Sequence, residues 1–181
     1  LYAKREHLEA MPPFLGGGSM IQQVHRDGFS PNDLPAKFEA GTPPITGAVG
    51  LAAAIDWLRQ FDWADVEAHE EQLMIAALNV LSSIDGLTTL GGENHKSQIT
   101  NREISGCLSF TLDSVHPHDL TEILGRNGIC LRAGHHCTQP LHDHLGITAS
   151  TRLSVGIYNS PTEIDAVANQ LRMAKDRLTM T

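Results

Sequence analysis

A short segment in the second half of the chain brings a thiol, two imidazoles and a guanidinium together in Arg132-Ala-Gly-His-His-Cys137. The segment follows an apolar, strand-like run, Gly128-Ile-Cys-Leu131, and this order predicts that Cys137 lies on a loop. A second cation, Arg152, stands on the next strand-like stretch. Positive charge near a thiol favours the thiolate, which is the nucleophilic form of cysteine. The residue types and their spacing therefore predict a reactive sulfur at Cys137.

Cysteine side chains also serve as inert packing residues, and that alternative stays open for Cys137. Its polar and small neighbours favour reactivity, whereas Cys107 and Cys130 lie in apolar strand patterns and are expected to pack in the core. The three cysteines show no paired spacing, which is typical of a reducing compartment, so a cytoplasmic location is expected.

The same part of the chain is rich in residue types that bind zinc: His135, His136, Cys137, His142 and His144. Adjacent His-His-Cys side chains do not converge readily on one ion, and no C-x-x-C pair is present to complete a tetrahedron. We expect no metal site, with a zinc-binding structural domain as the outside alternative.

Arg132 and Arg152 lie on separate predicted strands, each near the Cys137 loop in the sequence. A guanidinium binds a carboxylate in bidentate fashion, so the two residues suggest an anionic substrate. Surface arginines in structural ion pairs are the commoner case, and the sequence pattern does not decide between these interpretations. In Glu39-Ala-Gly-Thr-Pro43 a backbone turn and a hydroxyl suggest a phosphate site, although Gly-Thr-Pro is equally a plain turn.

The elements that must position these residues follow from hydrophobic periodicity. Residues 1–45 are punctuated by glycine and proline and are expected to be irregular. Beyond them the patterns predict, in order, two helices, a strand, a helix, two strands and a last helix: a helix after Thr46, 62–82, 107–112, 117 to about 127, 129–132, 151–158 and a helix opened by the capping box Ser160-Pro-Thr-Glu163.

This order predicts an α+β fold in which residues 61–181 form a compact domain around one small sheet. Residues 1–60 are interpreted as part of a neighbouring domain with a connecting helix. The chain begins Leu1-Tyr-Ala-Lys4, without an initiator Met, and we expect that it was cut from something longer.

Composition narrows the function classes further. The net charge is −8 and no basic run occurs, which argues against general nucleic-acid binding. A membrane span takes about 18 or more apolar residues, and no such run is present. With 41% hydrophobic and 19% charged residues, the composition is that of a globular protein.

The segment Arg132-Ala-Gly-His-His-Cys137-Thr-Gln-Pro-Leu141 resembles the catalytic-cysteine segment of the SufS-like (group II) cysteine desulfurases. The resemblance runs over essentially the whole chain, in the family's order, through Leu1-Tyr-Ala-Lys4, Met11-Pro-Pro-Phe-Leu-Gly-Gly-Gly-Ser-Met-Ile21, Phe38-Glu-Ala-Gly-Thr-Pro43 and Arg152-Leu-Ser-Val-Gly-Ile-Tyr-Asn159. The cysteine segment is the most specific of these blocks.

The resemblance implies the small C-terminal domain of a fold type I enzyme that depends on pyridoxal 5'-phosphate (PLP), together with a remnant of its large domain. Such enzymes convert L-cysteine to L-alanine and carry the sulfur as a protein persulfide, which an acceptor protein takes up for iron–sulfur cluster assembly. It implies that Cys137 becomes the persulfide, that Arg152 holds the substrate carboxylate and that Arg132 supports the same pocket. Gly41 and Thr42 would reach the cofactor phosphate of the partner subunit in the family's homodimer.

One departure from the family is serious. The family's Schiff-base lysine stands in a Ser-x-His-Lys setting just upstream of the block that begins this chain, and none of Lys4, Lys37, Lys96 and Lys175 has that setting. We therefore expect a C-terminal portion of the enzyme, unable alone to bind PLP covalently or to turn over cysteine. Within the family, selenocysteine lyase and cysteine sulfinate desulfinase activities stay open. From a different class, the chain could act only as a module that docks a sulfur acceptor.

Overall fold

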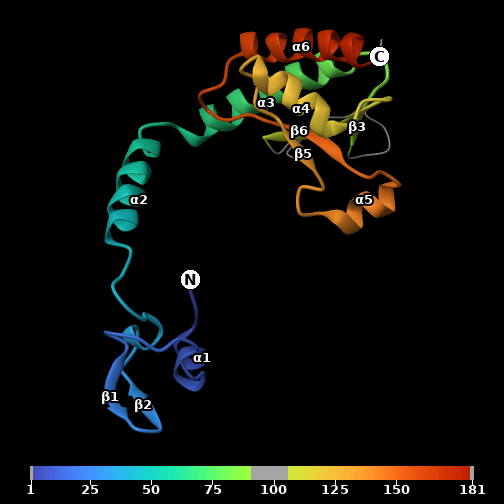
Figure 1. Ribbon diagram of the computed structural model, residues 1–181. Coiled ribbons are helices and arrows are strands. Elements are labelled where there is room, and N and C mark those ends of the chain that lie inside the picture. The colour runs from blue at the N-terminus through green and yellow to red at the C-terminus, as the bar shows by residue number, and fades with distance from the viewer. Residues whose placement is uncertain (1, 91–105, 180–181) are drawn as a thin grey trace. The chain divides into compact units, whose positions relative to one another are not determined.

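The computed structural model describes residues 2–90 and 106–179. The chain divides into two compact units, residues 1–60 and 61–181, and each is considered by itself (Figure 1). Helices and antiparallel strands occur in both, which confirms the predicted α+β class. None of the described helices is both long and apolar enough to cross a bilayer.

The unit from residue 61 onward is built on an antiparallel sheet with the strand order β3-β4-β6-β5. Its described elements are α3 (Trp63–Leu81), β3 (Leu87–Leu90), β4 (Cys107–Leu112), α4 (Pro117–Arg126), β5 (Arg132–Gly134), α5 (Gln139–Leu145), β6 (Ser150–Ser154) and α6 (Pro161–Thr179). β4 and β6 are central, and β5 is an edge strand that pairs with β6.

The two faces of this sheet differ because side chains alternate along a strand. On β4, Phe110 is buried on the apolar face, whereas Cys107 on the opposite face is exposed. Helices α3, α4 and α6 lie over the apolar face, and their side chains join those of the sheet in one core (Figure 1). We call the opposite side the polar face of the sheet; the residues that define it are Cys107, Ser109, Arg132, Ser150 and Arg152.

Helices α3, α4 and α6 start where the sequence predicts, whereas α5 was not predicted. The Asp62 carboxylate accepts a hydrogen bond from the Ala64 N–H at 2.9 Å and caps α3. Pro117 lies in the first turn of α4. Before α6, the Glu163 carboxylate accepts from the Ser160 backbone N–H at 2.7 Å and from its hydroxyl at 3.1 Å. These hydrogen bonds, with one from Asn159, favour the charged carboxylate and hold the pKa of Glu163 below its usual value.

The first wrong strand prediction covers residues 129–132, because β5 begins only at Arg132. Gly128 has a φ of 80° and follows the end of α4. The Ile129 N–H then bonds back to the Leu124 carbonyl at 3.0 Å. The backbone of these residues therefore closes a helix instead of joining the sheet.

The second wrong strand prediction covers residues 151–158, because β6 ends at Ser154. Beyond it the chain turns: the Gly156 N–H donates to the Asn159 side-chain oxygen at 2.9 Å. The Asn159 N–H donates in return to the Gly156 carbonyl at 3.0 Å. This local turn uses backbone N–H and carbonyl groups that an extension of strand β6 would need for pairing.

In the first unit, the expectation of an irregular stretch over residues 1–45 is wrong. Its described elements are α1 (Arg5–Ala10), β1 (Ile21–His25), β2 (Gly28–Pro31), the 3-10 turn η1 (Ala36–Phe38) and α2 (Ile45–Leu58). The predicted helix after Thr46 corresponds to α2. The earlier elements are too short to show a hydrophobic period, which is why the glycines and prolines dominated the prediction.

Candidate active site

Cys137 lies on the loop that joins β5 to α5, as the sequence predicts, and it is exposed. His136 and Cys137 both adopt left-handed backbone conformations, with φ of 53° and 62°. Such conformations cost residues with side chains about 1–3 kcal/mol each, and they persist where surrounding contacts hold them. Here the Thr138 N–H and hydroxyl both donate to the His135 carbonyl, at 2.8 and 2.7 Å, and close the loop around Cys137.

Arg132 contacts the sulfur: its Nη2 atom lies 3.8 Å from Cys137 Sγ. Arg132 is the first residue of β5, and antiparallel pairing sets it opposite Arg152 on β6. Strand pairing thus brings together the three residues that the sequence singled out, Cys137, Arg132 and Arg152. Their roles in a reaction stay a prediction at this point.

Arg152 lies in the middle of the polar face, between Ser109 on β4 and Arg132 on β5. Its side chain is half-buried, and its Nε atom is buried without a hydrogen-bond partner in the described part of the chain. Cations directly opposite each other repel. No carboxylate among the described residues lies within ion-pair distance of either guanidinium. The two arginines therefore offer positive charge to an anionic ligand.

His136 adds an imidazole but little charge to this site. Burial of the ring and the nearby positive charge of Arg152 hold the pKa of His136 below the usual histidine value, although a hydrogen bond to Ser150 opposes this. Arg132 lowers it further. At neutral pH the ring is therefore mostly uncharged, and the positive charge comes from the arginines.

Two residues beside His136 carried little or no sequence signal. His142 was noted only as a zinc-ligand type and Ser150 was not noted, yet both are buried. The Ser150 hydroxyl lies 3.0 Å from Nε2 of His136 and 2.9 Å from Nε2 of His142. The one available signal was Pro140, which suits the first turn of a helix and indicates α5, the element that carries His142.

Gly41 and Thr42 belong to the first unit. Gly41 has a φ of 87°, and no atom lies within 4 Å of the position that a Cβ would take. Its N–H already donates to the Gly18 carbonyl at 2.8 Å, whereas Thr42 is exposed. An open backbone beside an exposed hydroxyl fits one edge of a phosphate, with the Thr42 hydroxyl as the available donor.

A covalent link to PLP takes a lysine amine, and two of the described lysines are already engaged. Lys37 Nζ donates to the carbonyls of Leu8 and Glu9, at 3.0 and 3.1 Å, and Lys175 Nζ lies 3.2 Å from the Asp85 carboxylate. Lys4 is exposed at the start of α1, and Lys96 lies outside the described residues. In the first unit, the Gly41–Thr42 turn thus suits a phosphate such as that of PLP.

No three His, Cys, Asp or Glu side chains of the described residues are grouped closely enough to hold a metal ion. The histidines near Cys137 are instead packed together: the His135 and His142 rings lie edge to face, with centroids 5.5 Å apart.

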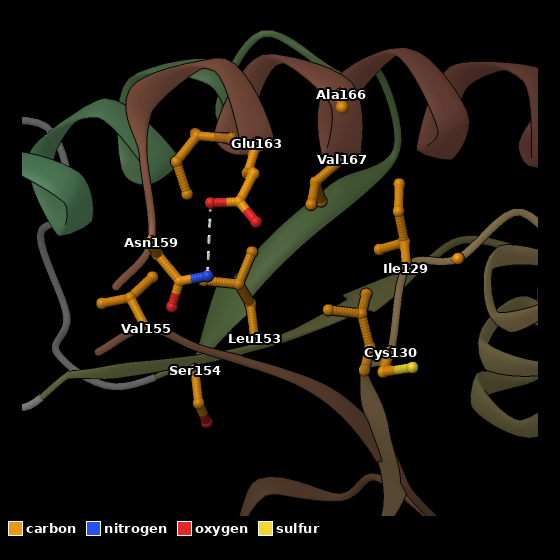
Figure 2. Close-up of a pocket in the computed structure, with 12 residues that line it drawn as sticks. Ile129, Cys130, Leu153, Ser154, Val155, Asn159, Glu163, Ala166 and Val167 are labelled. Carbon is orange, nitrogen blue, oxygen red and sulfur yellow. Dashed lines mark hydrogen bonds between the residues drawn. The ribbon is translucent and has the colours of Figure 1, made fainter. Parts of the chain in front are cut away.

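A cavity of about 420 Å³ opens elsewhere in this unit, lined by residues of the α4–β5 connection, the end of β6 and the start of α6 (Figure 2). Cys130, and not Cys137, is among its lining residues. The Asn159 side-chain amide donates a hydrogen bond to the Glu163 carboxylate at 3.4 Å, and Figure 2 draws this bond as a dashed line. That carboxylate is therefore already committed to the start of α6.

The expectation that Cys107 and Cys130 pack in the core is wrong, because both are exposed. Cys107 alternates with the core-facing side chain of Leu108 and so lies on the polar face. Cys130 precedes β5 in the segment that was wrongly predicted as strand.

Comparison with known proteins gives a consistent result. Residues 1–167 match the protein-family model described as aminotransferase class-V. The cysteine desulfurase of Haloferax volcanii is 46% identical over 176 residues, which cover 97% of this chain and 40% of that protein. The probable cysteine desulfurase of Vibrio cholerae is 44% identical over 178 residues, covering 98% of this chain and 42% of that protein. The chain thus spans about 40% of the length of these curated relatives.

Two solved structures are similar across both units. The cysteine desulfurase CsdA of Escherichia coli, in an S-sulfonic acid form, matches with a TM-score of 0.83 and 37% identity over 97% of this chain and 41% of that chain. The apo cysteine desulfurase of Thermococcus onnurineus NA1 matches with a TM-score of 0.82 and 33% identity over 97% of this chain and 42% of that chain. The relatives found by sequence and those found by fold are therefore both cysteine desulfurases.

Proposed function

The chain belongs to the aminotransferase class-V family, and on this premise we propose that it supplies the sulfur-accepting part of a cysteine desulfurase. The observation that carries the proposal is the contact between Arg132 Nη2 and Cys137 Sγ, 3.8 Å long, on an exposed loop. The sulfur is thus exposed and has a guanidinium beside it, and a cysteine sulfur is the nucleophile that such a reaction needs.

Cys137 acts as the nucleophile toward the sulfur of L-cysteine. A sulfur–sulfur bond forms at Cys137 while the carbon–sulfur bond of the substrate breaks. The electron pair of the broken bond stays with the carbon skeleton, which takes up the proton that the substrate thiol carried, so L-alanine leaves and Cys137 holds a persulfide. No external oxidant or reductant is needed, because the substrate sulfur takes the oxidation level of a persulfide as the carbon is reduced to a methyl group.

Arg152 and Arg132 bind the substrate carboxylate. The two cations lie opposite each other on neighbouring strands, and no carboxylate of the described residues pairs with either. This arrangement suits one bound anion. PLP, when bound, supplies the electron sink that lets the carbon–sulfur bond break. Thr42, beside the open backbone of Gly41, is suited to its phosphate.

The wider setting is also part of the proposal. A persulfide on an exposed loop is accessible to a protein that accepts sulfur, in keeping with a role in iron–sulfur cluster assembly. A homodimer, in which Gly41 and Thr42 reach the partner's cofactor, and a cytoplasmic location complete it.

The test is alanine formation from L-cysteine by the full-length protein that contains this chain, loaded with PLP. Cys137→Ser should abolish turnover and the mass gain of one sulfur atom on the peptide that holds residue 137. Undiminished turnover in this variant would remove Cys137 from the reaction.

Cys130→Ser is the matched control, because Cys130 is exposed like Cys137 but lines the separate cavity shown in Figure 2. This variant should retain turnover. If the protein acts on selenocysteine or cysteine sulfinate in place of L-cysteine, the proposed substrate is wrong, whereas the proposed site stands.

A further inference from the structure

A buried hydrogen-bonded chain runs from α5 to the residue before Cys137. Ser150, fully buried at the start of β6, lies between the imidazoles of His136 and His142, and His142 is only 3% exposed. Ser150 and Arg152 share the polar face, since they alternate with Thr151 along β6. The hydrogen-bonded series His142–Ser150–His136 therefore lies next to the two arginines but does not include them.

The proton on His142 can be assigned from its partners. Nδ1 of His142 lies 3.1 Å from the Thr138 carbonyl oxygen, which can only accept a hydrogen bond. It also lies 3.4 Å from the Thr138 hydroxyl, whose own proton is donated to the His135 carbonyl at 2.7 Å. Both partners therefore act as acceptors, so Nδ1 of His142 carries a proton.

The remaining protons follow in order. A buried imidazolium without a carboxylate partner is costly, and none of the described carboxylates pairs with His142. The ring is therefore neutral, its Nε2 is an acceptor, and the Ser150 hydroxyl donates to it. Ser150 Oγ then accepts from Nε2 of His136, which leaves Nδ1 of His136 with its electron pair.

The surroundings of Nδ1 of His136 differ from those of its Nε2. Nδ1 of His136 is buried and has no hydrogen-bond partner in the described part of the chain. It belongs to the residue bonded to Cys137, on a loop where both residues are left-handed. Burial and the positive charges of Arg152 and Arg132 lower the pKa of His136, which agrees with a neutral ring.

We propose that His142 and Ser150 are positioning residues, which hold His136 as the neutral tautomer protonated at Nε2 and so fix the Cys137 loop with an unshared electron pair at Nδ1. The tautomer follows from the hydrogen-bond chain alone. Its effect on sulfur transfer rests on the proposed function. Because the arginines lie outside the chain, losing it should slow persulfide formation more than it weakens cysteine binding.

The first test is nitrogen-15 NMR of the histidine rings in the full-length protein, with His136→Gln used to identify the His136 signals. We expect a protonated Nε2 and an unprotonated Nδ1 at neutral pH. His142→Leu removes the acceptor for Ser150, so its hydroxyl can turn toward His136 and the proton should move to Nδ1. His142→Gln places an amide oxygen where Nε2 was and should restore the original tautomer. A His136 ring protonated at Nδ1 in the unmodified protein, or unchanged in His142→Leu, overturns the proposal.

The second test is kinetic, in the same protein loaded with PLP. His142→Leu and Ser150→Ala should lower kcat by about 10-fold through misplacement of the loop while KM for L-cysteine changes by less than about 2-fold. His142→Gln should recover kcat, and Ser154→Ala, an exposed serine on the same strand, should leave both constants unchanged. If kcat is unaffected although the tautomer switches, the positioning role is wrong. If the unmodified protein makes no alanine or persulfide, the proposed function fails while the tautomer result stands on its own.

Discussion

The two units of this chain differ in how far their apolar side chains are buried. In residues 61–181, three helices and one sheet face share a core in which Leu73, Phe110 and Leu171 are at most 1% exposed. In described residues 2–60, Met20 is the one buried hydrophobic side chain. Helix α2 has no buried residue, although most of its residues are apolar.

The difference teaches which forces shape each unit. Burial of apolar surface holds the second unit together. The elements of the first unit are held by local hydrogen bonds, such as that from the Asn32 N–H to the Met20 carbonyl at 2.7 Å. The described elements of the first unit, including the Gly41 turn, thus lack a shared core, whereas Cys137 lies in the unit that has one.

The largest expected effect tests this contrast with one substitution made in each unit. Phe110→Ala opens the core of the second unit and should lower the free energy of unfolding by about 3–5 kcal/mol. Phe14→Ala, at a side chain 73% exposed in the first unit, should cost about 1 kcal/mol or less. Urea unfolding followed by circular dichroism measures both, and equal losses would break the comparison.

The next effect concerns where substrate binds. Arg152→Gln removes a charge-assisted pair with the substrate carboxylate, worth about 1.5–3 kcal/mol, so KM for L-cysteine should rise about 10- to 100-fold. Arg59→Gln, at an exposed arginine of the first unit, should leave KM unchanged. Steady-state kinetics of the full-length protein would decide, and a similar KM in both variants argues against carboxylate binding at Arg152.

A smaller effect concerns how helices begin in the two units. α3 has the Asp62 cap, whereas α2 follows Pro44, which makes no side-chain capping bond. Asp62→Ala should therefore destabilise the second unit by about 1 kcal/mol, and Asp62→Asn should preserve most of the cap. Thermal unfolding gives the difference, and equal melting temperatures for the two variants would show that the cap contributes nothing.

The smallest effect is a pH dependence confined to the second unit. The pKa of His136 in the folded chain lies below the reference value of 6.5, so the neutral ring contributes its full stability above pH 6.5. That contribution is lost as the pH falls from 6.5 through the folded pKa. His136→Gln should flatten this part of the stability profile, while His25→Gln, on the exposed hairpin of the first unit, should retain the slope. An unaltered slope in His136→Gln would contradict the assignment.

Local signals in the sequence predicted much of the second unit. Asp62, Pro117 and the Ser160–Glu163 pair mark helix starts because each satisfies or removes a backbone donor within a few residues. Strand ends were predicted wrongly because they depend on competing turns at Gly128 and Asn159. The short elements of the first unit escaped prediction since no hydrophobic period can develop within them.

The residues of the candidate site also fall into those that could be predicted from the sequence and those that could not. Arg132 and Cys137 could be paired from the sequence because they are close along the chain, and Arg152 because it lies on the following strand. The exposure of Cys107 was also readable, since it alternates with Leu108. The link from His142 through Ser150 to His136 was not, because it requires α5 to fold back onto the start of β6.

The position of β5 at the margin of the sheet has a further consequence. It contributes only Arg132–Gly134 to the ladder, all of it paired with β6. Detaching the segment from β5 through α5 would break that short ladder and the Ser150 bonds but leave every helix over the apolar face in place. Opening of this segment alone should therefore cost less free energy than unfolding of the whole unit.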